Sequence, residues 1–370
     1  MTITTTVPSP TPAPAIGTEP DLGQRLMDAT TSTLELYAVY LGDRLGLYDA
    51  LDRHGPLDAE GLARTAGIAD RYALEWLEQQ AVAGLLTVVD GDDEQSRRFA
   101  LPAEHRGVLA DPLDGEHLAP FASMVVGIAG VLDEVVEAYR TGGGVPYAHY
   151  GTAFRHGQGA INRPAFSTDL VKAWLPAVAG VPTALADGGL VLDVGTGAGW
   201  SAIAVKCAWP AARVVGVDTD EGSIADARTN AASAAVDVDF VLARDHEGGD
   251  LAELGPADVV LVLEALHDMA RPVDVLVAAR EALSPGGIVV VADEAVAETF
   301  TAPGDDLERM MYGWSVSHCL PASMAESPSA AIGTAIRPST VAAIAADAGF
   351  GQCDVVDVDA GFFRLYRLSV

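Results

Sequence analysis

The sequence predicts an α/β fold, with a doubly wound, mostly parallel sheet preceded by a smaller helical unit. From residue 190 onward, short apolar segments alternate with Ala-rich segments of helical length. Strands this apolar are covered on both faces, which is typical of a parallel sheet with helices on either side. The last two apolar segments, 353–358 and 362–370, are split by only a short turn. We expect them to form an antiparallel hairpin at the C-terminal edge of the sheet.

Residues 21–110 form the helical unit. Asp58 is a good N-cap for a short helix that should end at Gly67, a second helix follows, and residues 85–101 read as two short strands around a polar turn. An earlier helix is expected to present one apolar face, formed by Leu34, Tyr37, Ala38, Leu41, Leu45 and Tyr48. Three helices followed by a hairpin make a winged-helix pattern.

The remaining boundaries follow from composition. Residues 1–20 are rich in Thr and Pro and lack a basic residue before an apolar block, so we expect a disordered tail and not a secretory signal. Residues 111–188 read as a mostly helical linker that contributes to a substrate pocket. Residues 189–370 read as the ligand-binding domain with the doubly wound sheet.

Charge and cysteine content limit the partners. The chain has 52 acidic and 22 basic residues, a formal charge of −30, which disfavours nucleic acid as a partner. It has no apolar run of about 18 residues, so we expect no membrane partner. Its three cysteines are isolated; this fits a reducing, cytoplasmic location and predicts no metal site.

The segment VLDVGTGAGW (191–200) forms a glycine-rich turn between a predicted strand and a predicted helix, where backbone amides can hold a polar ligand. The third glycine comes one residue too early for a dinucleotide fingerprint, Trp200 takes the next position, and no Gly-Lys-Ser/Thr follows. Asp193, just before the loop, suits a cationic ligand. Asp218 and Asp245 end the next two strands, where they can reach ribose hydroxyls and an adenine amino group.

These motifs, together with VVGVD, ARD and LEALHDM, resemble in order those of class I S-adenosylmethionine-dependent methyltransferases. From about residue 21, the chain resembles small-molecule methyltransferases of the plant-type O-methyltransferase architecture, in a bacterial branch, with a Rossmann-like catalytic domain. The resemblance implies S-adenosyl-L-methionine as cofactor. The resemblance implies that Gly195, Gly197 and Gly199 contact the methionine part of the cofactor. It likewise implies that Asp218 binds the ribose and that Asp245 contacts the adenine.

Three further residues are candidates for cofactor binding. Glu264, at the end of the fourth predicted strand, could touch the cofactor amine or orient His267, and the same holds for Glu294 one strand later. His246 follows Asp245 directly, but it could equally be a loop histidine without chemistry.

His267 and Asp268 are the candidate catalytic pair. They follow the fourth strand at the carboxyl edge of the sheet, where a neutral imidazole is suited to general-base work near pH 7. The resemblance implies this role, although Met269 follows where the plant pattern continues with Trp. Alternatively, His267 caps the strand end or binds cofactor.

Candidate substrate-binding residues come from two segments. Met310, Trp314 and His318 recur at four-residue spacing on a predicted helix, at the place where relatives build a substrate lid; such a stripe could also be core. Tyr147, Tyr150 and Trp174 are further candidates.

The sequence as a whole predicts a homodimeric methyltransferase of secondary metabolism that acts on a small aromatic or polyketide-like molecule, with oxygen as the favoured acceptor. The winged helix is expected to dimerise, because residues 58–80 carry five acidic and only two basic residues where a DNA reader needs Lys and Arg. Two alternatives remain: a cyclisation or rearrangement that uses the bound sulfonium as a fixed charge, and a ligand-sensing winged-helix regulator.

Overall fold

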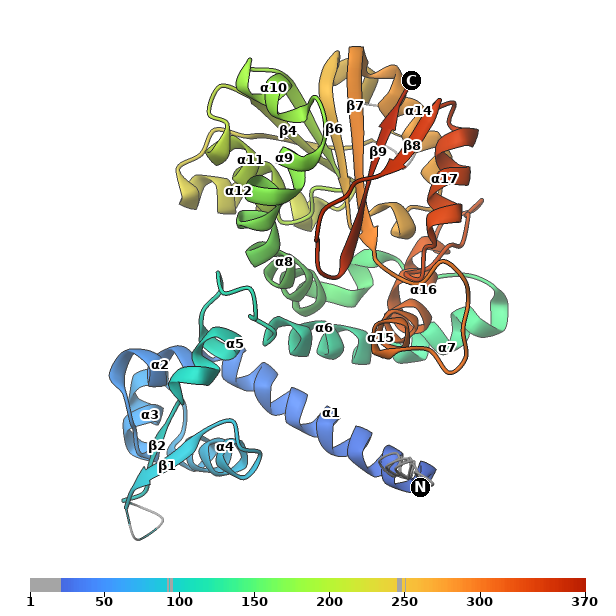
Figure 1. Cartoon of the computed structure of the whole chain (residues 1–370). Helices are drawn as coiled ribbons and strands as arrows, with labels where there is room; N and C mark the ends of the chain where they lie inside the picture. Colours follow the sequence, from blue (N-terminus) through green and yellow to red (C-terminus); the bar gives the residue numbers. More distant parts are fainter. Residues whose placement is uncertain (1–20, 92, 94–95, 245–247, 250) are drawn as a thin grey trace, which may run out of the picture.

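The computed structural model describes residues 21–91, 93, 96–244, 248–249 and 251–370, so the tail predicted over 1–20 lies outside the described residues. Figure 1 shows a sheet domain, a layer of helices beneath it, and a separate N-terminal unit from which the long helix α1 projects. Among the described residues, no helix is both long and apolar enough to cross a membrane.

The sheet domain confirms the predicted fold class. Its seven strands lie in the order β5-β4-β3-β6-β7-β9-β8, and the five strands from β5 to β7 are parallel. The last strand, β9, inserts antiparallel between β7 and β8, which leaves β8 at the edge. The strands are β3 (Leu190–Val194), β4 (Arg213–Asp218), β5 (Asp239–Leu242), β6 (Ala257–Leu263), β7 (Leu283–Glu294), β8 (Gln352–Val355) and β9 (Phe363–Ser369).

Helices cover both faces of this sheet, as the apolar strands predict. Alternate residues of β6 belong to opposite cores: Val259 and Leu261 to one, Val260 and Val262 to the other. The covering helices are α9 (Leu175–Ala177), α10 (Val181–Ala186), α11 (Trp200–Ala208), α12 (Glu221–Ala234), α13 (Leu251–Leu254), α14 (Pro272–Glu281) and α17 (Pro338–Asp347). The chain between β3 and α11, and between β6 and α14, therefore emerges at one common edge.

A layer of helices lies across that carboxyl edge (Figure 1). It combines the linker with the segment that follows β7, and it separates the sheet from the N-terminal unit. Its members are α6 (Pro120–Ala129), α7 (Leu132–Thr141), η2 (Tyr147–Tyr150), α8 (Gly151–Ser167), η3 (Leu170–Trp174), η4 (Leu266–Asp268), α15 (Asp306–Trp314), η5 (Ser315–Cys319) and α16 (Leu320–Ser323).

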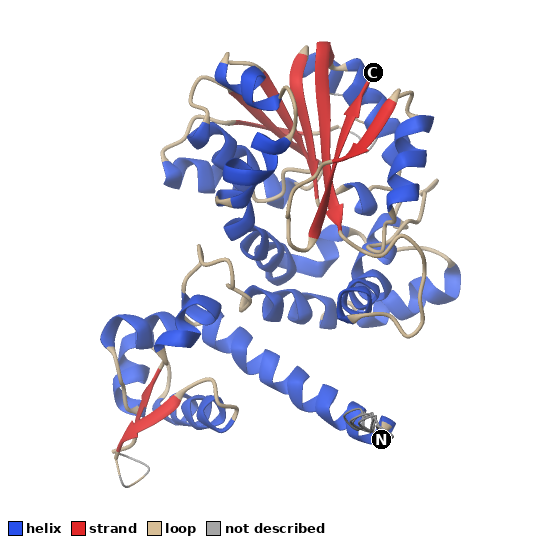
Figure 2. Cartoon of the chain, in the orientation of Figure 1, coloured by secondary structure: helices blue, strands red, loops and turns tan. Residues whose placement is uncertain are grey.

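The N-terminal unit has the predicted winged-helix order, with a small two-stranded sheet that Figure 2 shows apart from the large one. Asp58 caps α3 by accepting a hydrogen bond from the Gly61 amide, and Gly67 ends the helix in a left-handed conformation. The elements are α1 (Leu22–Arg44), α2 (Leu47–His54), α3 (Ala59–Ala66), α4 (Asp70–Val82), β1 (Thr87–Asp90), β2 (Arg98–Ala100), η1 (Ala103–His105) and α5 (Arg106–Ala110).

The single apolar helix face predicted to reach Tyr48 is wrong in two respects. Helix α1 ends at Arg44, because Gly46 adopts a left-handed φ of 66° and α2 begins at Leu47. Tyr48 then turns into the core, where its hydroxyl donates to Gln80 and its ring meets Trp76 edge to face. The other large residues of that face, Leu34, Tyr37, Leu41 and Leu45, are exposed in this chain.

Candidate functional site

The glycine loop opens onto a cavity of about 510 Å³ at the carboxyl edge of the sheet. Gly195 and Gly197 both line it in left-handed conformations, which let the backbone turn sharply from β3 toward α11. A Cβ at Gly197 would meet no atom within 4 Å of it. The backbone at Gly197 is therefore open to the cavity.

Two residues predicted to bind the cofactor do not line this cavity. Asp193 is buried beneath the loop, where its carboxylate accepts hydrogen bonds of 2.6 Å from the hydroxyls of Thr196 and Ser201. Gly199 faces Phe240, whose ring atoms would lie 2.8 Å from an added Cβ. Asp193 shapes the loop, and Gly199 allows close packing under it. Both residues therefore have structural roles, in place of the predicted contact with the cofactor.

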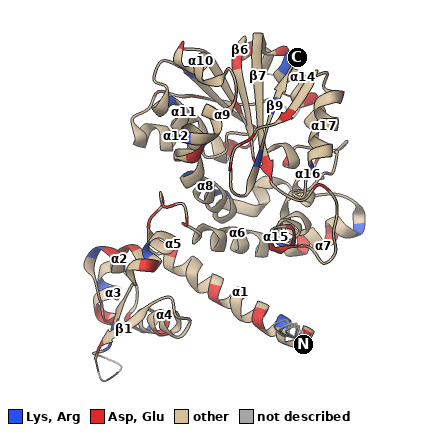
Figure 3. Ribbon diagram, in the orientation of Figure 1, with Lys and Arg blue, Asp and Glu red and all other residues tan. Residues whose placement is uncertain are grey.

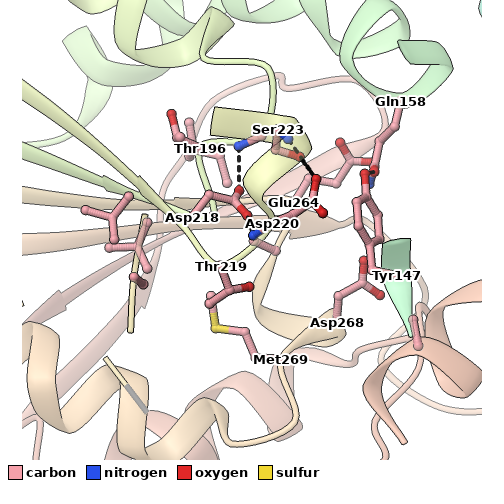
Figure 4. Close-up of a pocket in the computed structure, with 18 of the residues that line it drawn as sticks. Tyr147, Gln158, Thr196, Asp218, Thr219, Asp220, Ser223, Glu264, Asp268 and Met269 are labelled. Atoms are coloured by element: carbon pink, nitrogen blue, oxygen red, sulfur yellow. Dashed lines mark hydrogen bonds between the residues drawn. The ribbon is translucent and has the colours of Figure 1, made fainter. Parts of the chain in front are cut away.

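Asp218 lies at the predicted place, at the end of β4 and on the wall of the cavity (Figure 4). The amides of Gly197 and Asp220 donate to its two oxygens at 2.8 and 2.9 Å. Burial outweighs these bonds and raises the pKa of the Asp218 carboxyl to about 6. The carboxylate can still accept a further hydroxyl. The expectations for Asp245 and His246 lie outside the described residues.

A second cavity, of about 130 Å³, lies beside the first. Phe121, Met124, Phe154 and Ile161 supply much of its apolar wall from α6 and α8. Met310, Trp314 and His318, predicted from their spacing, line it from α15 and η5, and the Trp314 ring stacks on Phe121 with a centroid distance of 5.7 Å. Four residues line both cavities: Gln158, Asn162, Glu264 and Asp268.

His267 is buried between carboxylates beside this second cavity. Its Nδ1 lies 2.6 Å from Oδ1 of Asp293, and its Nε2 lies 3.2 Å from Oδ1 of Asp268. Glu294 is also close, with Oε2 at 3.3 Å from Nδ1. Asp293 and Glu294 end β7, the neighbour of β6, so adjacent parallel strands bring these groups together.

These carboxylates change the expected charge of His267. Burial by itself would lower the pKa of the imidazole, but Asp268, Glu294 and Asp293 together raise it well above 6.5. Burial would likewise raise the pKa of Asp268, yet His267 outweighs burial and lowers that pKa to about 2. The expectation of a neutral imidazole at pH 7 is therefore wrong for this structure: His267 is an imidazolium held by ionised Asp268 and Asp293.

His318 has the opposite environment. Its ring stacks on Phe154 at 3.9 Å between centroids and is met edge-on by Tyr150. Burial among these rings lowers the pKa of His318 to about 4, so the imidazole is neutral near pH 7. Its Nε2 is buried and has no hydrogen-bond partner. Of the histidines that line the second cavity, His267 is thus cationic and His318 neutral.

Of the three aromatic residues of the linker that are candidates for substrate binding, the fold places only one at a cavity. Tyr147 lines the large cavity, and its hydroxyl donates to Gln158 at 2.7 Å. Tyr150 lines neither cavity, because its hydroxyl donates to the Ser317 carbonyl and its ring supports His318. Trp174 is buried in the core of the sheet domain between Phe166 and Phe363. The prediction that Trp174 and Tyr150 contact the substrate is therefore wrong, and both residues have packing roles.

Several residues of the site were not predicted. Gln158, Asn162 and Arg155 all come from α8, whose sequence carries no motif that points to a ligand. Asp293 could have been found, because it directly precedes Glu294 at the end of a predicted strand. Phe121 and Phe154 carry no local signal, since apolar residues of a linker helix look the same whether they line a cavity or a core.

The sequence predicts no metal site, whereas two groups of described residues bring potential ligand atoms together: His267 with Asp268 and Cys319, and His267 with Asp293 and Glu294. His267, Asp293 and Glu294 place potential ligand atoms within 4.8 Å of one another. The 2.6 Å contact between His267 and Asp293 is a hydrogen-bond distance. It is shorter than the roughly 3.3 Å that separates two ligand atoms around tetrahedral zinc. The group of His267, Asp293 and Glu294 is therefore a hydrogen-bonded network.

Comparison with known proteins identifies two domains in the chain. Residues 185–338 match the family described as "Methyltransferase domain", and residues 33–111 match the "Rv2258c-like winged HTH domain". A curated relative, the ubiquinone biosynthesis O-methyltransferase of Roseobacter denitrificans, is 38% identical over 101 residues. That match covers 27% of this chain and 39% of the relative, so the chain spans about two fifths of the length of the curated relatives it matches.

Solved structures share the architecture over nearly the whole chain. Human N-acetylserotonin methyltransferase in complex with SAM has a TM-score of 0.68 at 17% identity, covering 96% of this chain and 99% of that one. The mitomycin 7-O-methyltransferase MmcR has a TM-score of 0.65 at 19% identity, covering 94% and 97%. CalO1, a methyltransferase of calicheamicin biosynthesis in its SAH-bound form, has a TM-score of 0.60 at 20% identity, covering 95% and 99%.

At such identities these likenesses show the fold alone, and the domain matches show what residues 33–111 and 185–338 are similar to. The described elements agree with them: a winged-helix unit over α2 to β2, then a helical layer, then the seven-stranded sheet with its antiparallel last strand. The chain thus carries a segment similar to a winged helix-turn-helix domain, followed by a segment similar to a methyltransferase domain, in a fold that it shares with solved O-methyltransferases.

Proposed function

We propose that the protein is an S-adenosylmethionine-dependent methyltransferase that methylates a hydroxyl of a small, uncharged, aromatic metabolite. One observation carries the proposal: two cavities of different chemistry meet at Gln158, Asn162, Glu264 and Asp268. One is bounded by the glycine loop and strand-end acids, as a cationic nucleoside requires, and the other is largely apolar. A donor and an acceptor can therefore face each other across these four side chains.

The larger cavity fits the cofactor by its volume and its donor set. Asp218 presents a carboxylate that can accept ribose hydroxyls, and residues 195–197 of the glycine loop line the same space. Bound there, S-adenosylmethionine would supply an electrophilic methyl group on a sulfonium. The chain's part is to hold the acceptor oxygen in line and to exclude water.

The smaller cavity suggests the acceptor. Among the described residues that line it, none is Lys or Arg, whereas Glu264, Asp268 and Glu294 are acidic. An acceptor with a carboxylate or phosphate would meet these acids, because the positive charge of His267 is already paired with Asp268 and Asp293. A volume of about 130 Å³ is close to that of engineered cavities, about 150 Å³, that bind benzene. One aromatic ring therefore suits this space.

The proton of the acceptor hydroxyl has a path to His267. Asp268 lines both cavities and its Oδ1 lies 3.2 Å from Nε2 of His267. Asp293 holds the opposite nitrogen, which fixes the orientation of the ring. We infer that His267 with Asp268 accepts the proton, once His267 has itself lost its own proton to solvent.

The proposed assembly is a homodimer. Helix α1 buries only Val39 and Gly42 of its 23 residues. Leu34 and Leu41 are 62% and 49% exposed, and most of α1 carries no charge in Figure 3. A second copy of the chain could cover this face, and each fully covered Leu would contribute about 1.5–3 kcal/mol. No observation favours the rearrangement or regulator alternatives.

The activity can be tested directly. The purified chain, S-adenosylmethionine and a set of single-ring phenols would be incubated, and products read by mass spectrometry. The expected result is a gain of one methylene by neutral phenols, with phenols that carry a carboxylate or phosphate left unchanged. Absence of methylation, together with no binding of S-adenosylmethionine by calorimetry, would contradict the proposal.

A further inference from the structure

The four residues shared by the two cavities mark where a group must pass from donor to acceptor. Two of them, Gln158 and Asn162, are neutral amides from α8. The other two, Glu264 and Asp268, are acids that follow β6. Whatever reactive group the larger cavity presents to the smaller one will lie against these side chains. The junction therefore combines neutral hydrogen-bonding groups with two carboxyl groups.

Glu264 is held at this junction from two sides. Its backbone has a φ of 52°, a left-handed conformation that is uncommon for a residue with a side chain. Its amide donates to the Ala292 carbonyl at 2.7 Å, and Asn162 Nδ2 donates to its Oε2. Strained residues of this kind persist only where their surroundings hold them, and they cluster at functional sites.

The charges around the larger cavity have one predominant sign. Its charged lining residues are Arg155, Asp218, Asp220, Glu264, Asp268 and Glu326. Arg155 is already paired with Asp226 at 2.8 Å. Five acids and one paired base favour a ligand with a net positive charge.

S-adenosylmethionine and its product S-adenosylhomocysteine differ in this respect. The first carries a sulfonium, and the second carries a neutral thioether at the same atom. We propose that Glu264 is a charge-selecting residue: its carboxylate at the junction of the two cavities makes the protein bind the sulfonium more tightly than the thioether product. This inference rests on the proposed function, and it implies weak inhibition by the product.

The protonation of Glu264 provides an independent signature. Burial raises the pKa of its carboxyl to about 7, against the lowering effects of His267 and Asn162. The other acids that face it are Asp268 on η4 and Asp293 and Glu294 on β7. A cation at the junction favours the carboxylate and lowers this pKa, so binding the sulfonium near pH 7 should release a proton.

The thioether should release fewer protons, because it adds no charge beside Glu264. Asp218 also has a pKa close to neutral, at about 6, but its ribose partner is identical in both ligands. The difference between the two ligands therefore isolates the group that faces the sulfur atom. The sign is fixed: affinity for the sulfonium rises between pH 6 and pH 8, while affinity for the thioether changes less.

The experiment is isothermal titration calorimetry of the full chain with both ligands, at pH 7, in phosphate and in Tris. These buffers differ in ionisation enthalpy. The difference between the binding enthalpies observed in the two buffers therefore gives the number of protons released. We expect more proton release with S-adenosylmethionine than with S-adenosylhomocysteine, and about tenfold or more tighter binding of the former, as a charge-assisted contact provides. Glu264→Gln should abolish both differences, with thioether affinity retained.

The matched control is Glu298→Gln, at an exposed loop position, which should keep both differences. Equal affinities of the wild type for the two ligands, with heats independent of buffer, would overturn the inference and leave the proposed function standing. Binding of neither ligand would overturn the proposed function itself. The wild-type comparison needs no variant, so it decides the matter even if Glu264→Gln does not fold.

Discussion

Nδ1 of His267 lies 2.6 Å from Oδ1 of Asp293, a residue 26 positions later in the chain and on the neighbouring strand. This contact, with Asp268 on the opposite nitrogen, makes the candidate base a cation near neutral pH. An imidazolium cannot accept a proton. Activity that depends on His267 as a base must therefore follow the deprotonation of this histidine.

The first prediction is a pH profile. If His267 is the base, the single-turnover rate should rise with pH, with a midpoint well above 6.5, because the pKa of His267 is raised. His267→Gln should lower the rate by about 10²–10⁴ and remove this rise. His149→Gln, at an exposed histidine paired with Glu134, is the control and should behave as wild type. A His267→Gln variant within a few-fold of wild type, with the rise intact, would exclude this role.

The second prediction concerns Asp293. Replacing it with Asn removes one of the negative charges that raise the pKa of His267, so that pKa must fall. The rise in rate should move to lower pH, while the affinity for S-adenosylmethionine changes little because Asp293 does not line the larger cavity. A rate profile of Asp293→Asn that superimposes on the wild-type profile would argue against control of His267 by this contact.

The third prediction concerns cofactor affinity. Asp218→Asn should weaken binding of both S-adenosylmethionine and S-adenosylhomocysteine by about 10- to 100-fold, since a charge-assisted hydrogen bond is worth about 1.5–3 kcal/mol. Calorimetry of both ligands measures this loss. Asp239→Asn, at an exposed position on β5, serves as the control. Unchanged affinity in Asp218→Asn would mean that the ligand is held elsewhere.

The fourth prediction separates two glycines of the same loop. Gly199→Ala should lower the free energy of unfolding by about 1–3 kcal/mol, because the new Cβ would lie 2.8 Å from Phe240 and 2.9 Å from Ala227. Gly197→Ala meets no atom within 4 Å and should cost less stability, although both residues have positive φ. Its methyl group should instead reduce ligand affinity, since Gly197 lines the cavity. Denaturant unfolding and calorimetry of the two variants test this; equal losses of stability would contradict it.

The fifth prediction tests the assembly. Light scattering of the intact protein should report two chains at micromolar concentration. A Leu34→Glu, Leu41→Glu double variant should shift the population to one chain, because it places charges on the exposed apolar face of α1. Val370→Glu, at an exposed terminal residue, should leave the mass unchanged. A wild-type protein that scatters as a single chain would remove the proposal that α1 dimerises.

Much of the fold was predictable because its signals are local. The uninterrupted apolar segments predicted a sheet covered on both faces, and Asp58 and Gly67 predicted the ends of one helix. The glycine loop and Asp218 were found because both lie at strand ends, and a parallel sheet brings all such ends to one edge. The four-residue spacing of Met310, Trp314 and His318 predicted a common face in the same way.

The sequence by itself therefore determined the fold class, the domain order and the edge at which ligands would lie. Only the tertiary structure decided which residues share a charge environment. Asp293 acts on His267 because β7 pairs with β6, and Asn162 holds Glu264 because α8 crosses the same edge. It also placed Trp174 in the core and Asp193 beneath the loop. The physical reason is that burial and pKa depend on every neighbour in space, whereas a sequence pattern reports only neighbours along the chain.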